Sequence, residues 1–325
     1  MNKTSFTCID AHTCGNPVRL VVEGAPILEG KDMSEKRQFF LQNFDWIRKG
    51  LMFEPRGHDM MSGAMIYPPH NPENDFSILF IETSGCLPMC GHGTVCLVTH
   101  LVDSAMLSCD SRNWHQAILD LPNGVAKVEY RKTKDGRIEV MLDVSAAKFT
   151  PANLDLAALA KILGIDIDDM SKELPPEIAT GDFIHLCLPI RDLAAMARLQ
   201  PDFDALTKFC VSNGLETIAA FSTQVVNAKR NIHVRDFCPA VGVTESAAAG
   251  TTNAALAAYL WRNNCVQADD TGHIIVCAEQ GIELGRPSQV TTRIKIKNEQ
   301  IIRLQVGGVA TRIIEGRLNI KMEPL

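Results

Sequence analysis

The sequence lacks three features, and each absence excludes a class of protein. No segment approaches the roughly 18 consecutive apolar residues of a membrane-spanning helix. No Cys-x-x-Cys pair occurs, although structural zinc sites usually contain such closely spaced pairs. Basic residues do not predominate, because 32 Lys and Arg stand against 38 Asp and Glu and give a net charge of −6. We therefore expect no membrane partner, no metal and no nucleic-acid partner.

The N-terminus also lacks the apolar core of a secretory signal peptide. The 11 cysteines are an odd number, scattered from Cys8 to Cys277, which is typical of free thiols rather than of a disulfide framework. Both observations predict a cytoplasmic protein.

A length of 325 residues with 46% apolar residues is enough for two domains with sizeable cores. Strand-like segments dominate both halves, and each half has one apolar helical run, residues 94–107 and 254–260. The first run is apolar nearly all the way round, so other structure should enclose it. The sequence predicts an α+β fold of two pseudo-symmetric domains, 1–145 and 146–305, each a β array or barrel around a buried helix. The strand 306–325 is a candidate to complete the first domain.

The stretch around Cys90 is the main candidate for a site. Cys90 precedes Gly91, His92 and Gly93, and the first helical run begins directly behind them. Free N–H groups and the dipole at a helix N-terminus attract anions and favour thiolate over thiol. We interpret Cys90 as a reactive cysteine beside a carboxylate site. The alternative is a buried cysteine in front of a core helix.

A second turn repeats this layout. Glu245 opens a run of small residues, and Gly250 and Thr251 lead into the second helical run. If the two turns faced each other across a cleft between the domains, their helix N-termini would form a doubled anion site.

The sequence resembles the proline racemase family, which shares its fold with diaminopimelate epimerase. The resemblance rests on Asp10-Ala11-His12-Thr13 with Gly15 and Pro17, on Pro55-Arg56-Gly57-His58, and above all on Met89-Cys90-Gly91-His92-Gly93-Thr94. It implies an enzyme without a cofactor, in which one cysteine removes the α-proton of a proline-like substrate and a second cysteine supplies a proton to the opposite face. By resemblance, Cys90 is the first cysteine.

The resemblance also implies that backbone N–H groups of Gly91, His92, Gly250 and Thr251 hold the substrate carboxylate. The second motif departs from the family's pattern, because Ala249 stands where the second cysteine belongs. Residues 237–245 are also similar to phenazine-biosynthesis-like relatives on the same fold, which lack the cysteine pair.

Three charged or polar residues have two open interpretations each. Glu245 takes the acidic position of the second motif, and it either pairs with the substrate amine or complements a helix dipole. His58 and Asp59 lie in a polar turn, and they either contact substrate or serve the turn itself.

A single cysteine favours elimination, because loss of a β-hydroxyl needs only removal of the α-proton. The first hypothesis is therefore a 3-hydroxyproline dehydratase. Proline racemase or 4-hydroxyproline epimerase is the alternative, followed by a carboxylic-acid isomerase or tautomerase and by a non-catalytic binder of small carboxylates. We expect a monomer or homodimer that acts on a small amino or imino acid. We also expect the helix dipole and a hydrogen bond from His92 to give Cys90 thiolate character near neutral pH.

Overall fold

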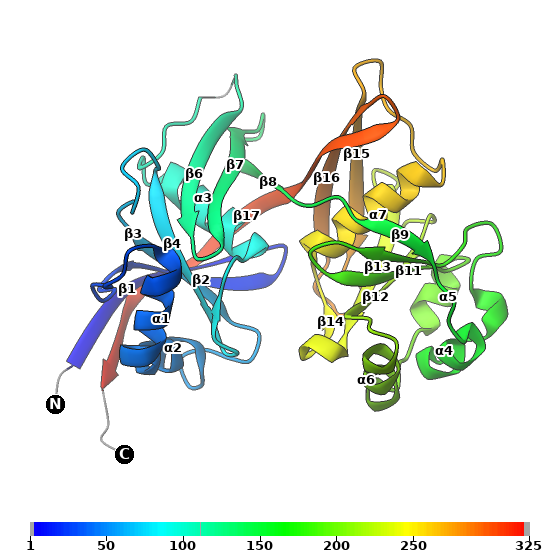
Figure 1. The fold of residues 1–325 in the computed structure, drawn as a ribbon, viewed down its shortest axis with the longest axis horizontal. Coiled ribbons are helices and arrows are strands. Elements are labelled where there is room, and N and C mark those ends of the chain that lie inside the picture. Colours follow the sequence, from blue (N-terminus) through cyan, green and yellow to red (C-terminus); the bar gives the residue numbers. More distant parts are fainter. Residues whose placement is uncertain (1–2, 111, 322–325) are drawn as a thin grey trace. The chain divides into compact units, whose positions relative to one another are not determined.

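The computed structural model describes residues 3–110 and 112–321 and contains two compact units (Figure 1). Unit 1 consists of Met1–Leu142 with Gly307–Leu325, and unit 2 of Asp143–Val306. For comparison, the sequence places the divisions after residues 145 and 305. In the part of the chain that the structure describes, no helix is long and apolar enough to cross a membrane.

Unit 1 is a ring of strands around one helix, α3 (Gly91–Asp103). Two further helices, α1 (Met33–Asn43) and α2 (Asp45–Met52), lie outside the ring. The strands of this unit are β1 (Lys3–Thr13), β2 (Asn16–Glu23), β3 (Ser62–Tyr67), β4 (Phe76–Glu82), β5 (Cys86–Leu87), β6 (His115–Leu121), β7 (Gly124–Lys132), β8 (Ile138–Asp143) and the greater part of β17 (Gln300–Lys321).

Strand pairing closes the ring of unit 1. From β1 to β8, the pairs are β1–β2, β2–β3, β3–β4, β4–β6, β6–β7 and β7–β8. Strand β17 then pairs with both β8 and β1. The C-terminal strand is therefore the element that joins the last strand of the ring to the first.

Alternating side chains give the ring two apolar faces. In β2, Val18 and Leu20 pack inward against α3, whereas Val21 packs outward with Phe40 of α1 and Leu51 of α2. This alternation follows from the two-residue period of a strand. Every residue of α3 from 93 to 101 is buried, as its all-round apolar pattern predicts.

Unit 2 repeats the plan around α7 (Gly250–Arg262), which lies among its strands in Figure 1. The strands are β9 (Lys148–Pro151), β10 (Glu177–Thr180), β11 (Ile184–Pro189), β12 (Thr217–Ser222), β13 (Ile232–Cys238), β14 (Val243–Ser246), β15 (His273–Gln280) and β16 (Ser288–Lys297). The other helices are α4 (Leu156–Leu163), α5 (Leu193–Arg198), α6 (Phe203–Ser212) and the 3-10 turns η1 (Ile167–Asp169) and η2 (Pro239–Val241).

Unit 2 also has two apolar faces. In β12, Ala219 and Phe221 pack with Tyr259 of α7, and the rings of Phe221 and Tyr259 meet edge to face with centroids 5.4 Å apart. Ile218 and Ala220 of the same strand point the other way, into a core that α4, α5 and α6 cover. Both units are thus mixed α and β structures with a central buried helix, which confirms the predicted fold class.

Gly307 of β17 packs directly against β8. A Cβ atom added there would overlap the carbonyl oxygen of Val140, whereas one added to Gly316 on the same strand would meet open space. We predict that Gly307→Ala lowers the free energy of unfolding by about 1–3 kcal/mol, the usual cost of overpacking.

Urea denaturation followed by circular dichroism measures this effect, with Gly316→Ala as the matched control. Equal stability of the two variants would contradict the tight β8–β17 contact.

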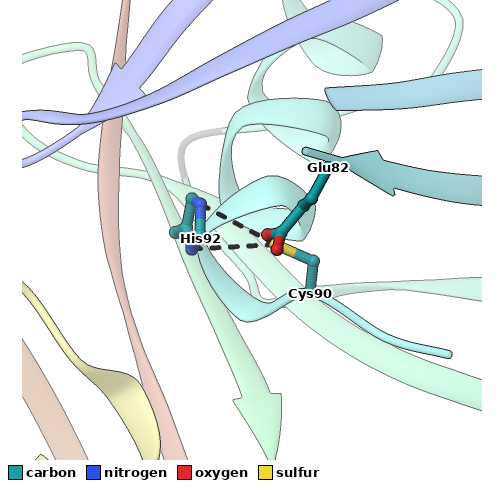
Figure 2. Close-up of side chains that lie close together, drawn as sticks. All are labelled: Glu82, Cys90 and His92. Carbon is teal, nitrogen blue, oxygen red and sulfur yellow. Dashed lines mark hydrogen bonds between the residues drawn. The ribbon is translucent and has the colours of Figure 1, made fainter. Parts of the chain in front are cut away.

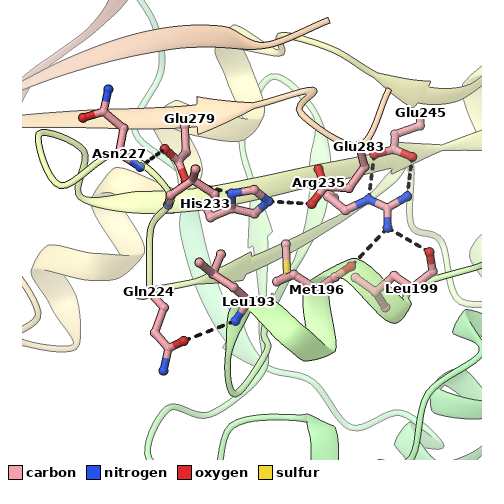
Figure 3. A network of polar contacts seen from close by, with 11 residues as sticks. Leu193, Met196, Leu199, Gln224, Asn227, His233, Arg235, Glu245, Glu279 and Glu283 are labelled. Carbon is pink, nitrogen blue, oxygen red and sulfur yellow. Dashed lines mark hydrogen bonds and ion pairs between the residues drawn. The ribbon is translucent and has the colours of Figure 1, made fainter. Parts of the chain in front are cut away.

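His233 of β13 lies between two carboxylates in unit 2 (Figure 3). Its Nδ1 is 2.9 Å from Glu279 Oε1, and its Nε2 is 2.8 Å from Glu283 Oε1. Burial alone would lower the pKa of His233, but the hydrogen bonds and charges of Glu283 and Glu279 raise it above its usual value. The imidazolium form, which donates from both nitrogens, therefore stabilises the folded state.

Because the folded-state pKa is raised, this stabilisation is complete below the unfolded pKa of about 6.5 and is lost as pH rises through the folded value. We predict that wild type exceeds His233→Gln in free energy of unfolding most near about pH 6, and that the difference shrinks toward about pH 9. Denaturant titrations at both pH values measure it, with the exposed His273→Gln as control. A difference that grows with pH would contradict the double ion pair.

Candidate active site

The first turn of α3 positions Cys90. Cys90 is the N-cap residue, with φ −141° and ψ 114°, and its carbonyl oxygen accepts hydrogen bonds from the backbone N–H of Thr94 at 2.9 Å and the Thr94 hydroxyl at 2.8 Å. The helix therefore begins three residues before the predicted range 94–107. It ends earlier as well, at Asp103, because Ala105 adopts a left-handed φ of 58°.

The first turn of α7 has the same construction. Its N-cap is Ala249, with φ −124° and ψ 111°. The Ala249 carbonyl oxygen accepts from the backbone N–H of Asn253 at 3.1 Å and from its side-chain amide at 2.8 Å. Ala249 is thus the residue of unit 2 that corresponds in local geometry to Cys90 of unit 1.

The two central helices begin differently from most of the outer helices, although α2 also has no side-chain cap. An aspartate side chain caps each of the helices α1, α4, α5 and α6, and these caps are Asp32, Asp155, Asp192 and Asp202. No side-chain hydrogen bond caps α3 or α7 within residues 3–110 and 112–321. The first N–H groups of both central helices can therefore donate to an anionic ligand.

Three side chains gather at the start of α3, and Figure 2 shows them together. Glu82 ends β4, and its carboxylate, the Cys90 sulfur and a His92 ring nitrogen all lie within 4.8 Å of one another. The sulfur is 3.7 Å from His92 Nδ1 and 3.8 Å from Nε2. Because these distances are nearly equal, the sulfur does not lie along the N–H or lone-pair direction of either nitrogen.

A serine hydroxyl links two members of this cluster. Ser62 of β3 donates to Glu82 Oε1 at 2.6 Å, and its oxygen lies 3.0 Å from His92 Nε2. Since the one hydroxyl proton goes to Glu82, Ser62 accepts from His92. This assigns the ring proton to Nε2 and leaves Nδ1 as an acceptor.

The cluster keeps Cys90 protonated. Burial raises the pKa of the Cys90 thiol, the negative charge of Glu82 raises it further, and the hydrogen bond from the Gly93 N–H lowers it only in part. Burial also lowers the pKa of His92 to about 4, so the imidazole is neutral near pH 7. The expected thiolate, stabilised by the helix dipole and His92, is therefore wrong for this arrangement, because desolvation outweighs both contributions.

Glu82, Cys90 and His92 are all residue types that can bind metals. A tetrahedral site needs the sulfur and a ring lone pair directed at one point. Here the Cys90 sulfur is almost equally far from both His92 ring nitrogens, so the sulfur and a ring lone pair are not directed at one point. The arrangement is better suited to proton transfer, because it combines a thiol, a carboxylate and a neutral imidazole.

The structure places the other predicted residues as follows. Gly91 and His92 form the first turn of α3 beside Cys90, and Gly250 and Thr251 form that of α7. His58 and Asp59 are exposed, and their carbonyl oxygens accept hydrogen bonds from the Met61 N–H and the Thr83 hydroxyl.

Glu245 already has a cationic partner. Its two carboxylate oxygens accept from Arg235 at 2.9 and 2.8 Å, and Arg235 also donates to the carbonyl oxygens of Met196 and Leu199 (Figure 3). Both side chains are buried. A role of Glu245 toward a substrate amine therefore stays a prediction, and the ion pair gives the residue a structural task.

Sequence reasoning missed Ser62 and Glu82. The only signal for Glu82 is a charged residue at the end of the apolar strand that leads to the cysteine turn. Conversely, two motif residues prove structural: Asp10 pairs with Arg19 at 2.7 Å, and Arg56 accepts a hydrogen bond from Arg19 through its carbonyl oxygen.

Comparison with known proteins supports the resemblance. A sequence model of the proline racemase family matches residues 8–163. The 4-hydroxyproline 2-epimerase of Spirosoma linguale is 44% identical over 210 residues, which cover 64% of this chain and 57% of that protein. The enzyme of the same name from Shewanella loihica is 59% identical over 133 residues, or 41% of this chain and 39% of that protein. The matches thus span less than two thirds of either relative.

Solved structures share the whole fold. A phenazine biosynthesis protein of the PhzF family from Bacillus anthracis superposes with a TM-score of 0.79 and 18% identity, covering 98% of this chain and 100% of that chain. A hydroxyproline epimerase from Agrobacterium vitis, with bound trans-4-hydroxy-L-proline, gives a TM-score of 0.64 and 13% identity, covering 98% and 93%. These similarities establish the diaminopimelate epimerase-like fold type. The part of the chain that the proline racemase family model matches, residues 8–163, contains Cys90.

Proposed function

We propose that Cys90 removes the α-proton of a hydroxyproline-type imino acid, and that the reaction is epimerisation at Cα. The observation that carries this proposal is a buried cysteine at the uncapped start of α3, within the residues 8–163 that the proline racemase family model matches. Relatives of this chain are named 4-hydroxyproline 2-epimerase. The relatives favour this reaction over the dehydration that the sequence alone suggested.

Substrate binding in this proposal relies on backbone donors. The carboxylate of the imino acid accepts hydrogen bonds from the N–H groups of Gly91 and His92, and we propose the same task for those of Gly250 and Thr251. Removal of the α-proton sends negative charge into that carboxylate. Preorganised donors aimed at such charge are typically worth about 3–4 kcal/mol in the transition state.

Epimerisation also needs an acid for the opposite face of Cα. Ala249 supplies none, but unit 2 contains a buried carboxyl group near the start of α7. Burial raises the pKa of Asp236 to about 7, and hydrogen bonds from Thr252 and Thr217 oppose this shift. Its Oδ1 has no hydrogen-bond partner among the described residues. The Asp236 carboxyl can therefore hold and release a proton near neutral pH, next to the Thr252 hydroxyl.

Dehydration of a 3-hydroxyproline is the second candidate function. The observation that favours it is Ala249 itself, which occupies the backbone position equivalent to Cys90 and has no side-chain proton. Elimination of a β-hydroxyl group requires one base and no donor on the second face.

Product analysis distinguishes these functions. We predict that wild type converts trans-4-hydroxy-L-proline into its Cα epimer on chiral chromatography. We expect Cys90→Ser to lower the rate by about 10²–10⁴-fold, because the weaker serine acid cannot replace the thiolate base. Cys109→Ser, at a half-exposed cysteine of the same unit, is the control.

Each alternative product has a clear meaning. A cyclic imine formed only from trans- or cis-3-hydroxy-L-proline would select the dehydratase. No product from any of these substrates or from L-proline would contradict both reactions and favour a binding protein.

The matching geometry of the two N-caps generates a gain-of-function prediction. Ala249→Cys should raise the epimerisation rate by about tenfold or more, because it places a thiol where the backbone repeats that of Cys90. Ala248→Cys, one residue earlier, is the control and should have no such effect. A well-folded Ala249→Cys variant without faster epimerisation would show that the equivalence of the two turns has no catalytic meaning.

A further inference from the structure

Glu82 is a half-buried carboxylate without a cationic partner. It ends β4 and lies beside the Cys90 sulfur (Figure 2). The Ser62 hydroxyl donates to it, and no arginine, lysine or histidine forms an ion pair with it across residues 3–110 and 112–321. The nearby guanidinium of Arg48 donates to the Glu82 backbone carbonyl oxygen at 2.7 Å and pairs with Asp45 instead.

Two buried carboxylates elsewhere in the protein are neutralised by arginine. Asp10 pairs with Arg19, and Glu245 pairs with Arg235, each through two hydrogen bonds from the guanidinium. Unpaired buried charge is costly, so an added cation beside Glu82 would be stabilised. Burial raises the pKa of Glu82, as expected for a carboxylate that has no cationic partner.

The same charge acts on Cys90. A carboxylate within 4.8 Å of the sulfur opposes formation of a second negative charge on the thiolate. A cation bound between or beside these groups would cancel that repulsion. An imino acid carries such a cation, because its ring nitrogen is a secondary ammonium group near neutral pH.

We propose that Glu82 binds the cationic ring nitrogen of the substrate and that this ion pair promotes loss of the Cys90 proton. The inference rests on the proposed function. On binding, the Cys90 S–H bond breaks and its proton passes to water. The thiolate then takes the proton from Cα, the C–H bond breaks, and its electron pair is delocalised into the substrate carboxylate. The substrate thereby activates the base that attacks it, and Glu245 need not serve the amine.

Two ligands of the same ring size test this assignment. L-Proline has a charged ring nitrogen, whereas that of pyrrole-2-carboxylate is neutral. Isothermal calorimetry should show that Glu82→Gln weakens proline binding by about tenfold or more, as loss of a charged hydrogen bond predicts, and leaves pyrrole-2-carboxylate unchanged. Glu73→Gln, in the exposed loop before β4, is the control and should leave both affinities unchanged.

A second measurement needs no substrate. Glu82→Gln removes the negative charge beside Cys90, so alkylation of Cys90 by iodoacetamide at about pH 8 should become several-fold faster. Mass spectrometry of the Cys90 peptide separates this signal from those of the other cysteines.

The outcomes separate the two proposals. Equal loss of affinity for both ligands, or an unchanged alkylation rate in Glu82→Gln, would overturn the role of Glu82. If wild type binds both ligands and exchanges no α-proton, the proposed function fails, and the difference between the ligands still decides whether Glu82 recognises the cation.

Discussion

The site depends on how α3 begins. The Thr94 backbone and hydroxyl both bind the Cys90 carbonyl oxygen, which fixes the cysteine at the N-cap and leaves the N–H groups of Gly91 and His92 free to bind a ligand. The ring of strands buries the rest of α3, so the helix cannot move to bring these N–H groups to other partners within the protein. An anion-binding turn and a thiol are therefore held together by the core itself. Unit 2 repeats the turn at α7 with alanine in place of the thiol.

Charge then determines what this thiol does. Burial and Glu82 oppose ionisation of Cys90, and the neutral His92 offers no compensating positive charge. A helix N-terminus is often credited with activating a cysteine, but here its contribution is smaller than the desolvation cost. A base that stays protonated until a cation enters is protected from unproductive reactions, and the unpaired Glu82 gives the site a means to sense that cation.

Local patterns in the sequence were sufficient for part of this account. The all-round apolar run predicted an enclosed helix, and the glycines around Cys90 predicted its uncapped start, since both features belong to neighbouring residues. Ser62 and Glu82 could not be found this way, because the pairing of β3 with β4 and the packing of α3 bring residues 62, 82 and 92 together from distant positions. The charged residues Asp10 and Glu245 suggested chemistry, but the sequence does not reveal that Arg19 and Arg235 neutralise them.

The central claim is that Cys90 exchanges the α-proton of an imino acid. Proton NMR of trans-4-hydroxy-L-proline in D₂O, with catalytic amounts of the wild-type protein, measures this exchange directly, whatever product follows. The account predicts loss of the α-proton signal at a rate proportional to protein concentration, and none with Cys90→Ser. Persistence of that signal with wild type, for this substrate and for L-proline and both 3-hydroxyprolines, would contradict it.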